Sequence, residues 1–272
     1  MNKKGINLLF LGDVFGELGI KIIEDMLPGL IKKWKIDFVV AQSENVSDRK
    51  GFIEADYLRL KAAGVNAFTL GNHVWSKPDI LKIINNEDII RPLNIEESYP
   101  GKGSNIFTLP NDVTIRVTSL MGITFNHLLP PWEEEYANNF FDYIDDIIEN
   151  GRKSDFHFID FHAETTSEKN VLALYLDGKI DGICGTHTHV QTNDARILPN
   201  GTAFITDAGM SGPSNCAIGA NFQEVYEKMR YGSKVRYKAG NNEPQFNGVL
   251  MQLNINKKLN KITPINIGPK LK

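Results

Sequence analysis

The chain has 272 residues, a length at which large α/β domains still fold as one unit. Its 30 basic and 33 acidic residues give a formal net charge of −3, which offers no general attraction for nucleic acid or an anionic membrane surface. Two cysteines are too few for a disulfide framework, and no apolar stretch approaches the roughly 18 residues that a membrane helix needs. We therefore expect a single domain over residues 1–272, located in the cytoplasm, and leave a homo-oligomer open.

The first half of the sequence alternates apolar runs of strand length with segments of helical period. Strands are expected at 6–12, 37–42 and 66–70, and helices at 17–33, 53–63 and 78–85. Two further runs, 105–110 and 113–120, are predicted as an antiparallel pair of strands, and a helix at about 132–149 follows a loop rich in proline and aromatic residues. Pro28 lacks a backbone donor, so we expect it to kink the first helix or to start a new turn.

The second half repeats this alternation. Strands are expected at 155–162, 179–185, 202–207, 248–255 and 262–267, and helices at 166–177 and 221–229. Such a pattern is typical of the α/β class, with mixed sheets covered by helices on their outer faces.

Polar side chains follow the ends of five predicted strands. They are Asp13, Glu44 with Asn45, Asn72 with His73, His162, and His187 with His189. Because ligands of open α/β sheets bind at the carboxyl ends of the strands, we expect these side chains to share one rim. Histidine nitrogens mixed with carboxylate and carboxamide oxygens indicate a transition-metal site. Two histidines that flank one residue, as in GTHTH (185–189), can each reach a different ion of a close pair.

Each of these residues also has a purely structural interpretation. Asp13 and Glu44 could be turn residues, Asn72 could occupy a tight turn after Gly71, and His162 could be a satisfied histidine at the edge of the core. Their joint occurrence favours the metal site. Unrelated turn residues would not be expected to place histidines, carboxylates and carboxamides at the same end of successive strands.

Four other residues have both a structural and a functional interpretation. Strand alternation in 155–162 places His157 on the face opposite His162, so His157 is predicted to pack in the core. Cys184 lies in an apolar run and is predicted to be a buried thiol. His127 is a weaker candidate for the wall of a substrate cleft. Lys169 is predicted to be a solvated surface lysine, with a phosphate contact at its helix N-terminus as the alternative.

The motifs GD (12–13), GNH (71–73) and GTHTH (185–189) resemble the calcineurin-like metallophosphoesterases. The longer stretches GDVFG, SEN, GNHVW, DFHAETTSEK, GTHTHVQT and ITDAGMSGP are similar to the YmdB-type phosphodiesterases, and the similarity covers nearly the whole chain. This resemblance implies a four-layer α/β/β/α sandwich with mixed sheets and a dinuclear metal centre at one edge.

The resemblance also implies a set of ligands. One ion would be held by Asp13, Glu44, Asn45 and His189, and the other by Glu44, Asn72, His162 and His187. Phe15 stands where the superfamily carries a histidine ligand, and Glu44 with Asn45 would compensate for it. His73 would remain free of metal and face the substrate. Val74 stands where many members have an acidic residue that orients this histidine, so its orientation here is open.

This reasoning predicts a metal-dependent phosphodiesterase of small, nucleotide-like diesters. The resemblance points to 2′,3′- and 3′,5′-cyclic nucleotides, with a metal-bridging hydroxide as nucleophile and His73 as general acid. The mixed donors suit iron or manganese, with zinc as a further candidate. Alternatives are a phosphomonoesterase of nucleotidase or protein-phosphatase type, and a regulatory protein that binds nucleotides or RNA-processing partners. A metal amidohydrolase also uses a His-x-His pair, but there it usually ends the first strand of a barrel, whereas here that strand ends at Asp13.

Overall fold

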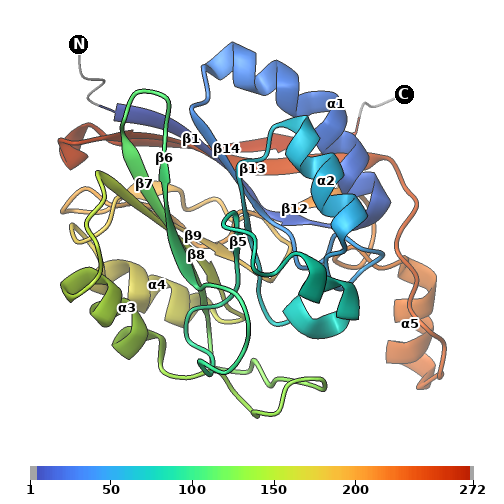
Figure 1. The fold of residues 1–272 in the computed structure, drawn as a ribbon. Coiled ribbons are helices and arrows are strands. Elements are labelled where there is room, and N and C mark those ends of the chain that lie inside the picture. The colour runs from blue at the N-terminus through green and yellow to red at the C-terminus, as the bar shows by residue number, and fades with distance from the viewer. Residues whose placement is uncertain (1–4, 270–272) are drawn as a thin grey trace.

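The computed structural model describes residues 5–269 and has four layers. Two β-sheets pack face to face, and helices cover the outer face of each sheet (Figure 1). This confirms the mixed sheets covered by helices that the sequence pattern predicted and the α/β/β/α sandwich that the resemblance implied. Within the described residues, no helix is long and apolar enough to cross a membrane.

The first sheet has eight strands and mixes parallel with antiparallel pairs. In spatial order its strands are β2 (Asp13–Val14), β12 (Met210–Pro213), β13 (Pro244–Asn254), β1 (Gly5–Leu11), β3 (Phe38–Gln42), β4 (Ala67–Thr69) and β5 (Ile89–Ile90), while β14 (Lys261–Ile267) pairs with β13. β1, β3, β4 and β5 run parallel to one another, so their carboxyl ends meet at one edge of the sheet. β13 pairs antiparallel with β1 over seven residues and fixes the opposite side of the first strand.

The second sheet has six strands. Their spatial order is β10 (Arg196–Ile197), β11 (Ala203–Ile205), β9 (Gly182–Thr186), β8 (Phe156–His162), β7 (Thr114–Met121) and β6 (Ser104–Thr108). The four inner strands are parallel, and β6 and β10 add antiparallel edges. The carboxyl ends of β8 and β9 therefore lie together, and they deliver the histidines of the second half of the chain.

The helices bury apolar stripes against the outer faces of the sheets. They are α1 (Gly16–Trp34), α2 (Glu54–Ala63), α3 (Phe140–Glu149), α4 (Thr166–Tyr175) and α5 (Phe222–Tyr231), with short 3₁₀ turns η1 (Val74–Ser76), η2 (Pro78–Lys82) and η3 (Lys257–Leu259). The stripe Ile20, Ile23 and Leu27 of α1 has the spacing of one helix face and packs against the first sheet. Residues of α3 and α4 pack on the second sheet, and a third core lies between the sheets.

The structure corrects several predicted elements. α1 continues past Pro28 to Trp34, so this proline does not end the helix. The helix expected at 78–85 is replaced by short 3₁₀ turns. The helix expected from residue 132 begins only at Phe140, where Asn139 caps it by accepting a hydrogen bond from the Phe141 amide. The short strands β2, β5, β10 and β12 were not predicted, because two to four residues carry no readable alternation.

Candidate metal centre

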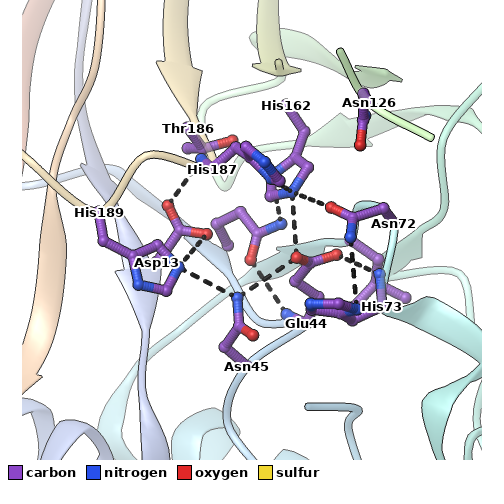
Figure 2. Close-up of polar contacts among 12 residues, drawn as sticks. Asp13, Glu44, Asn45, Asn72, His73, Asn126, His162, Thr186, His187 and His189 are labelled. Carbon is purple, nitrogen blue, oxygen red and sulfur yellow. Dashed lines mark hydrogen bonds and ion pairs between the residues drawn. The ribbon is translucent and has the colours of Figure 1, made fainter. Parts of the chain in front are cut away.

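The candidate site residues meet at the rim formed by the carboxyl ends of both sheets. Asp13 follows β1, Glu44 and Asn45 follow β3, Asn72 and His73 follow β4, His162 ends β8, and His187 and His189 follow β9 (Figure 2). Packing the two sheets face to face brings these strand ends together, although they lie up to 176 positions apart in the sequence. All eight predicted residues therefore contribute to one cluster.

One set of donors surrounds Glu44, His162 and His187. Their ligand atoms all lie within 4.8 Å of one another. His162 Nε2 is 3.0 Å from Glu44 Oε1 and 3.0 Å from His187 Nδ1. The side-chain oxygen of Asn72 faces the same nitrogen at 2.9 Å. Gly71 permits this approach, because a Cβ at that position would lie 2.3 Å from the His162 ring.

A second set of side chains comprises Asp13, Asn45 and His189, in which Asn45 presents its amide nitrogen and would have to turn its amide oxygen inward to bind a metal. His189 Nε2 lies 3.6 Å from Asp13 Oδ1 and 3.3 Å from Asn45 Nδ2. Asn45 Nδ2 is also 3.3 Å from Glu44 Oε1. Since Glu44 Oε1 also contacts the first set through His162, one carboxylate oxygen lies between the two groups of donors.

These residues fit a bound cation. Asp13 is fully buried, and its Oδ1 atom has no hydrogen-bond partner among the described residues. Its Oδ2 atom accepts a hydrogen bond from the backbone N–H of His187. An unsatisfied carboxylate oxygen in the protein interior is costly, and a metal ion would satisfy it. Nitrogen and oxygen donors in this mixture suit a first-row transition metal.

Oxygen acceptors orient two of the histidines from behind. His187 Nε2 lies 3.0 Å from Glu164 Oε2, which leaves His187 Nδ1 facing the centre. His189 Nδ1 lies 2.9 Å from the carbonyl oxygen of Ile218, which leaves His189 Nε2 facing Asp13. A proton held on the outer nitrogen fixes the tautomer that keeps a lone pair for a metal on the inner one.

Two buried side chains, those of Thr186 and Asp160, lie behind the third histidine, His162. Thr186 Oγ1 lies 2.9 Å from His162 Nδ1 and donates a hydrogen bond to Asp160 Oδ1 at 2.7 Å. Because the Thr186 hydroxyl donates to Asp160, its oxygen can accept a proton from His162 Nδ1, which also lies 3.1 Å from the side-chain amide nitrogen of Gln42. Asp160 also accepts a hydrogen bond from Thr69 at 2.6 Å. This arrangement leaves His162 Nε2 available to the centre.

Burial and charge shift the pKa values of these groups strongly. Burial disfavours the charged form of His162, but the Glu44 carboxylate outweighs burial and raises the pKa of this imidazole to about 9. His187 is buried beside His162, and its pKa falls to about 3. Burial raises the pKa of Asp160 to about 7. Without metal, His162 therefore carries the proton of the histidine pair, and a cation at this position must displace it.

The loop that carries His187 and His189 has an unusual backbone. Both histidines have positive φ angles, 94° and 64°, in a region that side chains with a Cβ rarely adopt. Thr188 between them donates a hydrogen bond from its hydroxyl to Asp207 Oδ2 at 2.7 Å. Lys169 Nζ binds the same oxygen at 2.8 Å. The prediction that Lys169 is a solvated surface lysine was wrong: its side chain is completely buried and its ion pair with Asp207 supports the loop.

His73 stands beside the ligand-type side chains. Its backbone N–H donates a hydrogen bond to Glu44 Oε2 at 2.7 Å, and its ring Nδ1 lies 3.3 Å from the side-chain amide nitrogen of Asn72. Burial lowers the pKa of the His73 imidazole, with the nearby Lys50 charge acting in the same direction. The side chain of Asn72 is thus the hydrogen-bonding neighbour of this ring, while Val74 is buried and apolar.

Two cavities meet at His73. The metal-centre cavity, about 510 Å³, contains His187 and His189 and is walled on one side by Ile218, Met229 and other apolar side chains. The cationic cavity, about 440 Å³, lies beyond His73. His127 lines the cationic cavity, and its role as the wall of a substrate cleft stays a prediction.

The remaining sequence predictions concern packing. His157 is buried and its Nε2 atom lies 2.9 Å from Thr118 Oγ1, as expected of a core histidine. Cys184 is completely buried in the core between the sheets, and burial raises the pKa of its thiol. Glu164 and Asp207 were not among the predicted site residues. Glu164 follows the His162 motif and could have been noted as a nearby carboxylate, but its contact with His187, like that of Asp207 with Lys169 and Thr188, depends on the folded structure.

Comparison with known proteins gives independent support. A family model described as YmdB-like protein matches residues 9–265. A Mycoplasma genitalium protein named as a phosphatase/phosphodiesterase is 41% identical over 254 residues, covering 91% of this chain and 88% of that protein. The 2′,3′-cyclic-nucleotide 2′-phosphodiesterase of Bacillus subtilis is 37% identical over 250 residues, 91% of each chain. The crystal structure of a phosphatase from Mycoplasma pneumoniae superposes with a TM-score of 0.88 at 37% identity, over 99% of this chain and 96% of that chain.

The layered fold, the mixed donors at its rim and these relatives define the class of protein. It is a metallophosphoesterase, an enzyme that hydrolyses phosphoric esters. Within this class the chain belongs to the YmdB-like family.

Proposed function

We propose that this enzyme is a phosphodiesterase of cyclic nucleotides that works with two metal ions. The observation that carries the proposal is the position of Glu44: its Oε1 atom lies 3.0 Å from His162 Nε2 of one set and accepts a hydrogen bond at 3.3 Å from the side-chain amide of Asn45 in the other. A carboxylate oxygen between two sets of ligand-type side chains would suit a bridge between two cations, because it would neutralise part of the charge of both while adding only one negative charge.

Each of the two sets of side chains, together with Glu44, is proposed to bind one ion. Asp13, Glu44, Asn45 and His189 would hold one ion, and Glu44, Asn72, His162 and His187 the other. Such a pair supplies activated water near neutral pH and offsets charge on the phosphoryl oxygens. Iron or manganese is favoured by the mixture of donors, with zinc as a third candidate.

His73 is proposed to protonate the leaving oxygen. In hydrolysis of a 2′,3′-cyclic nucleotide, water adds to phosphorus, the bond from phosphorus to O2′ breaks, and O2′ takes up a proton. The His73 imidazole borders both cavities and is not part of the Glu44, His162 and His187 cluster. It is therefore placed to serve the departing oxygen rather than a metal.

The metal-centre cavity is proposed to receive the nucleotide. The wall that faces the donors includes Phe15, Ile218, Val225, Met229 and Tyr237, which offer apolar and aromatic surface for a nucleobase. The Bacillus subtilis relative is named for 2′,3′-cyclic nucleotides, and this supports a substrate of that class. Hydrolysis of 3′,5′-cyclic nucleotides is proposed as a second activity of the same site.

A panel of phosphodiesters and phosphomonoesters tests the proposal. We expect turnover of adenosine 2′,3′-cyclic phosphate by the metal-loaded protein and little turnover of adenosine 3′-phosphate. The Glu44→Gln variant should lose both metal and activity while remaining folded. A clear preference for monoesters would instead favour the second candidate, a phosphatase, to which the name of the Mycoplasma genitalium relative also points.

A further inference from the structure

The cationic cavity differs in charge from the rest of the molecule. Its lining includes four permanently cationic side chains, those of Arg49, Lys50, Lys77 and Arg236, and one carboxylate, that of Asp48. The local excess is therefore three positive charges, in a chain whose formal net charge is −3. A concave site with this excess attracts an anion.

The cations of this cavity are not all neutralised by neighbours. Lys77 pairs with Asp48 at 2.6 Å, and the Asp48 side chain is largely exposed. Lys50 and Arg236 have no carboxylate within 4.0 Å among residues 5–269. Arg49 lies over the ring of Tyr237, 5.6 Å from its centre, and keeps its charge available at the junction of the two cavities.

The position of this cavity relative to His73 suggests which part of a substrate enters it. His73 lies across Glu44 from His189 and Asp13 (Figure 2). In an in-line displacement the leaving oxygen departs on the side opposite the attacking water. Since His73 is proposed to serve that oxygen, the cavity beyond His73 adjoins the leaving-group side of the ester. This step rests on the proposed function.

We propose that the cationic cavity binds a second phosphate of the substrate, carried on the leaving-group side of the scissile ester. The corresponding substrate class is a nucleoside 2′,3′-cyclic phosphate that also bears a 5′-phosphate. Its departing O2′ belongs to the same ribose as the 5′-phosphate, so one sugar connects the two cavities. Guanidinium and ammonium groups bind phosphate through charge-assisted hydrogen bonds, with arginine offering a bidentate geometry.

A matched pair of substrates tests this inference. The ratio of kcat/KM for adenosine 2′,3′-cyclic phosphate with and without a 5′-phosphate should exceed about 10 in the wild-type enzyme, and Arg236→Ala or Lys77→Ala should lower it about tenfold, because one charge-assisted contact is lost. Lys32→Ala removes an equal charge from the exposed face of α1 and should leave the ratio unchanged. A wild-type ratio near one would overturn the inference.

A binding experiment separates this inference from the proposed activity. Calorimetry on the metal-free protein compares adenosine 3′,5′-bisphosphate with adenosine 3′-phosphate. About tenfold tighter binding of the bisphosphate, lost in Arg236→Ala, supports the phosphate site even if neither cyclic substrate is hydrolysed, in which case the proposed function alone fails. Equal binding of the two nucleotides overturns the phosphate site, while turnover of the cyclic nucleotide would leave the proposed function standing.

Discussion

At the scale of single residues, the centre depends on which nitrogen of each histidine faces inward. His187 and His189 have one nitrogen against an oxygen acceptor, Glu164 and the Ile218 carbonyl respectively, and the other toward the donors. The ligand-type residues could be predicted from the sequence, because they follow apolar strands. The acceptors could not, because they depend on loop conformation and side-chain rotamers, and Ile218 contributes only a backbone carbonyl.

Glu164→Ala should weaken metal binding by about 10- to 100-fold, because His187 loses the partner that fixes its outer proton. Glu164→Gln keeps an acceptor oxygen and should recover much of the affinity. Competition with a chromophoric chelator measures both values. Glu149→Ala, at an exposed carboxylate ending α3, is the matched control and should bind metal as the wild type does. Wild-type affinity in Glu164→Ala would show that this carboxylate has no role in orienting His187.

His73→Ala should separate acid catalysis from metal binding. The backbone N–H that binds Glu44 survives this change, so both ions should remain. Activity on a cyclic nucleotide should fall by about 10²–10⁴-fold, because a ribose alkoxide leaves poorly without a proton. Activity on bis(p-nitrophenyl) phosphate should fall much less, because nitrophenolate needs no proton. Equal losses on the two substrates would remove the acid role, and loss of a metal ion would make His73 a ligand.

At the scale of elements, α4 supports the histidine loop through one buried ion pair. Lys169 on α4 and Asp207 after β11 are both buried, and Thr188 of the loop binds the same carboxylate. The sequence placed Lys169 correctly on a helix near its N-terminus. It could not reveal the burial, because the partner lies 38 positions away and meets Lys169 only when the sheet is assembled.

Lys169→Met should destabilise the metal-free protein by about 3–5 kcal/mol, because it leaves a buried carboxylate without its cation. Metal affinity should fall as well, since Asp207 holds Thr188 between the two histidines. Urea unfolding and chelator competition measure the two effects. Lys102→Ala breaks an exposed pair with Glu87 and should change the free energy of unfolding little, because solvent screens this pair. A comparably small cost for Lys169→Met would contradict a supporting role for the buried pair.

Helices and strands were predicted best where an element is long and periodic. The strand 155–162 and the helix beginning at residue 166 agree closely with β8 and α4. The helix expected from residue 132 begins only at Phe140, because a tertiary contact holds the preceding segment in a non-helical conformation. Trp132 Nε1 donates a hydrogen bond to the Asn72 carbonyl at 2.7 Å, which holds this segment as a loop beside the site.

At the scale of the whole molecule, the sandwich explains how distant motifs form one site. Parallel strands in both sheets end at one rim, and the core between the sheets sets their separation. The α/β class followed from the strand and helix pattern, whereas the pairing of the two sheets came from the resemblance to known metallophosphoesterases. The interpretation of 1–272 as one domain, the cytoplasmic location and a homo-oligomer stay predictions.

The central claim is that catalysis requires two metal ions at this rim. Metal-free protein is titrated with manganese or iron while bound metal per chain and turnover of adenosine 2′,3′-cyclic phosphate are measured on the same samples. We expect no turnover without metal and maximal turnover at two bound ions per chain. Full activity at one ion per chain, or turnover by the metal-free protein, would contradict it.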